Sequence, residues 1–186
     1  FVKIEKNAVS RNNTYSKTKF NSLPNPIWKI KNDNKISYKA RVLEVGIYNN
    51  LDEATTNFKI GETLRLLINY EVFSDDPVHV GFSIKNKYNQ LINTTNSYSL
   101  SLTTPKTSQR GHFQFAANIT LNLEAGKYSF LIKLALAGKK VNQGENLFET
   151  SWIGPIDINW NYNSDIPPFF GMFGLPVSAN INYNNK

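Results

Sequence analysis

The 186-residue sequence predicts an all-β protein, an antiparallel β-sandwich, on the basis of three observations. In one segment after another, apolar residues alternate with polar ones, which is the period of a strand with one buried face. Turn-forming residues separate these segments at regular intervals. No segment has the period of an amphipathic helix of useful length. Seven to nine such strands indicate an immunoglobulin-like or jelly-roll sandwich, and the pattern does not choose between these two.

The composition divides the chain into an N-terminal linker or tail, residues 1–35, and a sandwich domain, residues 36–186. The first region is rich in Asn, Lys, Ser and Thr, and its segment LPNPIWK contains two prolines. Phe20 and Trp28 are the residues through which this region is expected to dock onto the sandwich. Because the sequence begins at Phe1 rather than Met, we expect it to be a piece of a longer protein.

The first clear strand lies in GETLRLLINYEVF, residues 61–73, where every second residue from Leu64 to Val72 is apolar. A turn, SDDP, precedes VHVGFSI, residues 78–84, which repeats the same alternation. The stretch GFSIKNKYNQLINTTNS, residues 81–97, reads as a strand, a turn and a second strand. Asn89 is expected to take the left-handed backbone conformation that this turn needs.

The next two apolar alternations, HFQFAANITLNL and KYSFLIKLALA, are separated by the short segment EAG, residues 124–126, and predict a hairpin. In ETSWIGPIDINW, residues 149–160, Pro155 predicts an edge strand or a strand with a bulge. A segment of aromatic residues, glycine and proline follows. A last short strand is predicted with Val177, Ala179 and Ile181 in phase.

Composition limits the classes of partner. Cysteine is absent, so disulfides and thiolate metal sites are excluded. The net charge of +7 and pI of about 9.5 favour an anionic partner. The basic residues are scattered, however, and lack the arginine and aromatic cluster of a nucleic-acid groove, so nucleic acid is not expected as a partner. Proximity to an anionic membrane surface explains the same charge.

Motifs for catalysis, cofactors or metals are not found. The sequence has no phosphate-binding loop and no Gly-x-Ser-x-Gly nucleophile elbow. Its two histidines, His79 and His112, lack the spacing of metal ligands. The adjacent carboxylates Asp75–Asp76 and Asp52–Glu53 are interpreted as turn formers rather than as a convergent acid and base. The sequence therefore predicts neither an enzyme nor a cofactor in this chain.

The binding candidates are chosen by their phase in the strands: they alternate with the core residues and are expected to point away from the core. Trp152 is added as a candidate aromatic contact. Apolar residues such as Leu67 and Leu131 are interspersed among them. Two interpretations stay open: a second layer, a partner subunit or the tail covers these residues, or they bind a sugar through amides, charges and apolar contacts. The candidates are Arg65, Asn69, His79, Ser83, His112, Gln114, Lys133 and Trp152.

The order of four segments resembles a known family. They are ARVLEVGIYN, FKIGETLRLLINYEV, PVHVGFSIKNKYNQLINTTNS and GHFQFAANITLNLEAGKYSFLIKLAL, between Ala40 and Ala137, with a weaker similarity in FFGMFGLPV. In this order they resemble the C-terminal carbohydrate-binding domain of Wzt-type ATPases, the nucleotide-binding subunits of O-antigen ABC exporters. The segments differ from the family in the turn after residue 87, where Tyr88-Asn89 replaces Asp-Gly.

The resemblance implies a function. It implies a non-catalytic domain that binds the non-reducing, capped end of a lipid-linked O-polysaccharide and couples chain completion to export. It implies a homodimer that pairs or exchanges terminal strands, a transmembrane exporter subunit as partner, and a cytoplasmic location at the bacterial inner membrane. ATP and Mg²⁺ would belong to a preceding ATPase domain. The family motifs do not fix the binding residues, so the candidates above rest on strand phase alone.

Two alternatives stay open. The domain could serve dimerisation and assembly only, because exchange of a terminal strand is an easy route to a dimer. The same sandwich could also be fused to a polysaccharide-modifying methyltransferase or glycosyltransferase rather than to an ATPase.

Overall fold

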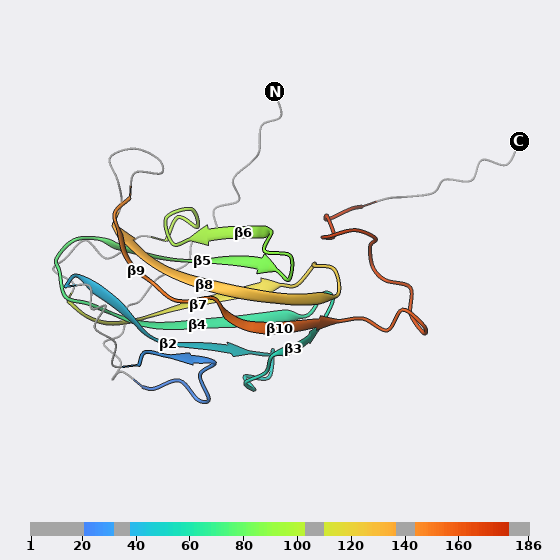
Figure 1. The fold of residues 1–186 in the computed structure, drawn as a ribbon, viewed down its shortest axis with the longest axis horizontal. Coiled ribbons are helices and arrows are strands. Elements are labelled where there is room, and N and C mark those ends of the chain that lie inside the picture. Colours follow the sequence, from blue (N-terminus) through green and yellow to red (C-terminus); the bar gives the residue numbers. More distant parts are fainter. Residues whose placement is uncertain (1–20, 32–37, 103–109, 137–143, 179–186) are drawn as a thin grey trace, which may run out of the picture.

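The structure, a computed structural model, describes residues 21–31, 38–102, 110–136 and 144–178 (Figure 1). These residues form ten strands in two sheets and contain no helix. The predicted all-β class is therefore confirmed. The count of ten exceeds the expected seven to nine. Two of the ten strands have only two and three residues, which is too short to give an alternating pattern.

Sheet A has four strands, all antiparallel. Its order is β1 (Trp28–Lys29), β2 (Ala40–Tyr48), β4 (Thr63–Val72) and β7 (Gly111–Thr120). Sheet B has six strands, in the order β3 (Asn57–Lys59), β10 (Ile153–Asn159), β8 (Gly126–Leu136), β5 (Val78–Asn86) and β6 (Leu91–Asn96), with β9 (Asn146–Glu149) also beside β8. The pair β3 and β10 is parallel.

The core lies between the two sheets and is built by the alternation seen in the sequence. In β4, Leu64, Leu66 and Ile68 are fully buried, and in β8 the residues Phe130 and Ile132 face them from the other sheet. Each such side chain stabilises the fold by about 1.5–3 kcal/mol relative to an exposed one. The predicted inward phases of β4, β5, β7 and β8 are thus confirmed.

The predicted hairpin between residues 112–123 and 127–137 is wrong. β7 pairs with β4 in sheet A, whereas β8 pairs with β5 and β10 in sheet B. The short connection at residues 121–125 crosses from one sheet to the other. Both strands bury one face in the same core, so their alternation is the same as that of a hairpin, and only the hydrogen-bond partners differ.

The hairpin of β5 and β6 is confirmed. Asn89 has a φ of 63°, the left-handed conformation expected of it. The side-chain oxygen of Asn86 accepts hydrogen bonds from the backbone N–H groups of Tyr88 and Gln90 at 2.9 and 3.1 Å. This arrangement closes the turn without glycine.

Near the C-terminus, the bulge expected at Pro155 is present, between Ile153 and Ile156, and β10 lies inside sheet B between β3 and β8. Val177 lies in an irregular segment rather than in the expected last strand, whose other members, Ala179 and Ile181, are outside the described residues. The irregular segment is tied back to the sandwich by a bridge between Leu123 and Phe173.

Part of the expected N-terminal linker belongs to the sandwich. β1 pairs with β2, and Trp28 packs against the core with its ring edge-on to Phe148 at 6.4 Å. Trp28 therefore docks this region, as expected. Phe20, the other residue named for docking, lies outside the described residues.

Candidate functional site

The eight candidate residues lie on two opposite faces of the molecule. Four of them, Arg65, Asn69, His112 and Gln114, project from the outer face of sheet A, here called face A. The others, His79, Ser83, Lys133 and Trp152, belong to the outer face of sheet B, called face B. Because the two sheets pack through their inner faces, these groups cannot line a single site.

Glu44 projects from β2 on face A. Its row on the sheet continues through Asn69 to Gln114. The amide nitrogen of Asn69 donates to Glu44 Oε2 at 3.4 Å, and the amide nitrogen of Gln114 donates to Asn69 Oδ1 at 3.0 Å. Asn69 is only 1% exposed. Its amide therefore serves the internal network of this face.

The segment of residues 21–29 lies over this row and holds Glu44 from above. The hydroxyl of Ser22 donates to one carboxylate oxygen at 2.6 Å, and the backbone N–H of Leu23 donates to the other at 2.8 Å. The ammonium of Lys29 lies 2.8 Å from Glu44 Oε1. Burial raises the pKa of Glu44, but these three donors outweigh it and lower the pKa to about 2. At neutral pH this carboxylate is ionised, and both of its oxygens already have partners within the protein.

Beside Glu44, a second buried apolar cluster forms on face A. It consists of Leu23, Tyr48 and Leu67. The hydroxyl of Tyr48 donates to the backbone carbonyl of Pro24 at 2.7 Å. Gly46 makes room for the Tyr48 ring, because a Cβ atom there would collide with it. The apolar Leu67, unexpected on an outward face, is thus covered by the N-terminal segment, one of the two interpretations left open above.

The remaining candidates on face A are paired with carboxylates. Arg65 makes an ion pair with Asp52, and the imidazole of His112 lies 3.5 Å from Glu71. Glu71 is held from its other side by Arg41 at 2.8 Å. The pair of Arg65 with Asp52 is a surface ion pair, and such pairs contribute little to stability.

Face B presents an exposed aromatic ring. Trp152 is 38% exposed, and the ammonium of Lys85 lies 4.3 Å from the centre of its indole. The same ammonium donates to Asn89 Oδ1 at 2.8 Å. A cation placed over an indole is attracted to the ring and limits its movement. Lys85 was not among the sequence candidates, because its contact with Trp152 joins two segments far apart in the chain.

Other polar groups lie on face B along β5, β6 and β8. The hydroxyls of Ser83 and Thr94 are 3.0 Å apart, and Thr94 is exposed. Lys133 makes an ion pair with Glu149 at 2.7 Å, and both side chains are about half exposed. Face B therefore combines an aromatic surface with hydroxyl, ammonium and carboxylate groups that solvent reaches.

His79 lies at the other end of β5. Its ring is 3.2 Å from the hydroxyl of Ser97 and stands edge-on to Tyr98 at 5.5 Å. Burial lowers the pKa of His79, so the imidazole is neutral at physiological pH. Its position separates it from the ring of Trp152.

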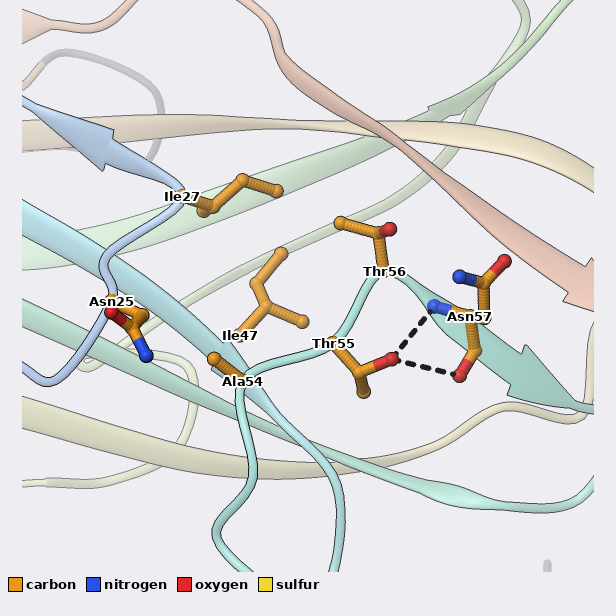
Figure 2. Close-up of a pocket in the computed structure, with 7 residues that line it drawn as sticks. All are labelled: Asn25, Ile27, Ile47, Ala54, Thr55, Thr56 and Asn57. Atoms are coloured by element: carbon orange, nitrogen blue, oxygen red, sulfur yellow. Dashed lines mark hydrogen bonds between the residues drawn. The ribbon is translucent and has the colours of Figure 1, made fainter.

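A cavity of about 360 Å³ is a third candidate (Figure 2). It is lined by Asn25, Ile27, Ile47, Ala54, Thr55, Thr56 and Asn57. Sequence reasoning missed it because its walls come from the expected linker and from the loop before β3. The only signal was the uncharged polar run TTN at residues 55–57.

Within the described ranges, no three His, Asp or Glu side chains are grouped as metal ligands, and no helix is long and apolar enough to cross a membrane. A family model, the Wzt C-terminal domain, matches residues 33–172 of the chain. This range is about three quarters of the sequence and includes all eight candidate residues.

The chain belongs to the Wzt C-terminal domain family. The resemblance found in the sequence is confirmed. The structure is similar to the crystal structure of the C-terminal domain of Wzt, with a TM-score of 0.63 and 16% identity over 77% of this chain and 84% of that one. At this identity the similarity shows a shared fold.

Other comparisons add little. The putative ApaA protein from Bordetella pertussis aligns with a TM-score of 0.37 and 10% identity, over 69% of this chain and 98% of that one, which is too low to support an argument. No curated protein matches the sequence. The Wzt family match begins at residue 33, so β1 and the segment over face A lie before it.

Proposed function

We propose that this domain is a non-catalytic carbohydrate-binding module of an O-antigen polysaccharide exporter, and that the glycan docks on face B around Trp152. The observation that carries the proposal is the exposed indole of Trp152 beside the ammonium of Lys85. Membership of the Wzt C-terminal domain family supports the choice of ligand class.

The chemistry of face B suits a sugar. The C–H face of a pyranose ring is apolar and packs against an indole, while its hydroxyl groups need donors and acceptors around the rim. Here Lys85 and Lys133 supply donors, Glu149 supplies acceptors, and Thr94 supplies both. Face A offers less, because Glu44 and Asn69 already use their polar atoms internally.

We further propose that the ligand is the capped, non-reducing end of the polysaccharide and that its binding couples chain completion to export. Each polar group left without a partner when the cap is missing costs about 1–3 kcal/mol, which is enough to select finished chains. The net charge of +7 suits a phosphate-bearing terminus or the surface of the inner membrane, where the parent protein would contact the transmembrane exporter subunit.

Titration of the domain with capped and uncapped O-polysaccharide, followed by tryptophan fluorescence and calorimetry, tests this proposal. The Trp152→Ala variant is expected to bind the capped chain at least roughly tenfold more weakly, a loss of about 1.4 kcal/mol. Tyr38→Ala, which removes an exposed aromatic ring outside face B, is the matched control and is expected to bind normally. Equal affinity of the Trp152 variant and the wild type contradicts the site.

A second candidate function is dimerisation and assembly. The C-terminal segment exposes Ile166, Phe170 and Val177 almost fully, with Leu175 close behind. Among the described strands, none pairs with the free edge of β7. An exposed apolar segment and an open strand edge each favour pairing with a second copy.

Light scattering with size-exclusion chromatography tests this second candidate. Phe170→Asp and Val177→Asp are expected to shift a dimer to monomer, while the exposed Leu51→Asp, on another loop, is expected to leave the oligomeric state unchanged. A wild-type chain that is monomeric at all accessible concentrations excludes the assembly function. A phosphate-binding loop in the upstream coding sequence would distinguish an ATPase parent from a methyltransferase or glycosyltransferase.

A further inference from the structure

The cavity in Figure 2 lies at the edge of the sandwich where the two sheets approach each other. One wall comes from the segment before β1 and from β2 of sheet A, and the other from residues 54–57, which lead into β3 of sheet B. Its volume of about 360 Å³ is at the lower end of the range for small-molecule sites, roughly 300–1,000 Å³. This size suits one ring rather than a chain.

One wall is largely apolar, with Asn25 beside Ile27 and Ile47, and the other wall is polar except for Ala54. Ile27 and Ile47 project toward each other in Figure 2, with Thr56 facing them. No charged side chain lines the cavity, although the protein has a net charge of +7. A charged ligand would lose hydration here without gaining a counter-charge, so the cavity favours a neutral one.

The polar wall is held in place by hydrogen bonds that leave other groups available. The hydroxyl of Thr55 accepts from the backbone N–H of Asn57 at 3.1 Å and donates to its carbonyl at 3.3 Å. The backbone N–H of Asp157 donates to the carbonyl of Thr56 at 2.7 Å, and that of Thr55 donates to Ile47 at 3.2 Å. The backbone of this wall is therefore fixed before any ligand arrives.

Three polar side chains of the lining have no hydrogen bond to other residues in the described part of the chain: the amides of Asn25 and Asn57 and the hydroxyl of Thr56. Together they offer two amide groups, each both donor and acceptor, and one hydroxyl. A purely apolar ligand would cover these groups without pairing them, which is unfavourable.

We propose that this cavity is a second ligand site, which binds one uncharged polyhydroxylated ring of the size of a monosaccharide. The C–H face of the ring packs against Ile27 and Ile47, and its hydroxyls pair with Asn25, Thr56 and Asn57. The proposal does not rest on the function of face B. Trp152 precedes the first residue of β10, whereas the cavity wall adjoins Asp157 near the end of that strand.

The test is a ¹H–¹⁵N NMR titration of the domain with the methyl glycosides of glucose, galactose and mannose, each as a separate probe. At least one is expected to bind with a Kd of roughly 1–10 mM and to shift the amide signals of residues 25, 27 and 54–57. Glucuronate and protonated glucosamine are the charged comparisons and are expected to bind at least about fivefold more weakly. Shifts of equal size with the charged sugars would overturn the proposal, as would no shift with any neutral glycoside.

Variants then separate this site from face B. Thr56→Val keeps the shape of the side chain and removes the hydroxyl, and Asn25→Gly removes an amide while tolerating the φ of 46° at this position. Each is expected to weaken binding of the best glycoside roughly three- to tenfold without changing the melting temperature. Thr120→Val, on the exposed edge strand β7, is the matched control and is expected to bind as the wild type does.

Trp152→Ala is expected to leave the cavity titration unchanged even where it abolishes polysaccharide binding, so failure of one site does not imply failure of the other. If Trp152→Ala removes the shifts at residues 54–57, or if Thr56→Val and Asn25→Gly bind the glycoside as tightly as the wild type, the cavity is not a ligand site.

Discussion

Face A and face B carry similar kinds of polar side chain but use them differently. On face A, the carboxylate of Glu44 and the amide of Asn69 are bonded to their neighbours and covered by residues 21–29. On face B, the rings and charges of Trp152 and Lys133 are open to solvent. Strand phase gives the direction of a side chain, but a distant segment decides whether that side chain is available to a ligand.

The largest expected effect on stability comes from removing the contacts between Glu44 and the segment of residues 21–29 that covers face A. Glu44→Gln removes the charge that Ser22, Leu23 and Lys29 surround, and is expected to lower the free energy of unfolding by roughly 2–4 kcal/mol. Urea unfolding followed by fluorescence measures this loss. Glu145→Gln, which loses an exposed ion pair with Lys39, is the control and is expected to cost less than about 1 kcal/mol. If both variants lose a similar amount of unfolding free energy, the contacts of Glu44 with residues 21–29 stabilise the fold no more than an exposed ion pair does.

Acid is expected to have a comparable effect on the wild type. The pKa of Glu44 is about 2 in the folded chain, against an ordinary value of 4.5 for a glutamate side chain, so folding favours the ionised form. Its contribution, about 3 kcal/mol, is fully present above pH 4.5 and is lost as the pH falls toward 2. Urea midpoints between pH 7 and pH 2 measure it. The Glu44→Gln variant is expected to lack this part of the pH dependence; an identical profile in both proteins would contradict the assignment.

A smaller effect is expected on glycan affinity when one side chain of face B and one of face A are substituted in separate variants. Lys85→Met keeps the length of the side chain but removes its charge over Trp152, and is expected to weaken polysaccharide binding about threefold to tenfold. Gln114→Ala, from face A, is expected to leave the affinity unchanged. Calorimetry on the two variants decides between the faces. If Gln114→Ala has the larger effect, the glycan binds face A.

The smallest expected effect concerns His79 on face B. Because burial lowers the pKa of His79, the unfolded chain binds its proton more readily than the folded one. Stability is therefore expected to fall slightly as the pH drops below 6.5. Histidine NMR signals followed from pH 8 to 4 are expected to place its midpoint below 6.5. A midpoint above that value contradicts the burial argument.

Much of the fold could be predicted because a strand buried on one face alternates apolar and polar residues, and each long strand shows this alternation. Leu64 and Leu66 in β4, or Phe130 and Ile132 in β8, needed no structure to be assigned to the core. The same period could not reveal that β7 and β8 belong to different sheets, since a hairpin and a crossover both bury every second residue. Pairing is a property of two segments together.

The candidate site was less predictable for the same reason. The contact of Lys85 with Trp152 and the cover of Glu44 by Ser22 and Leu23 join residues far apart in the sequence. The cavity joins Asn25 to Thr56 in a similar way. No local pattern encodes such contacts, although each residue type taken alone was compatible with a surface position.

The attachment of residues 21–29 to Glu44 also has a mechanical consequence. Within residues 21–29, the hydroxyl of Ser22, the backbone N–H of Leu23 and the ammonium of Lys29 all contact the carboxylate of Glu44. A force applied to this segment is therefore expected to reach β2 of sheet A through these three contacts, with Glu44 as the residue that receives it.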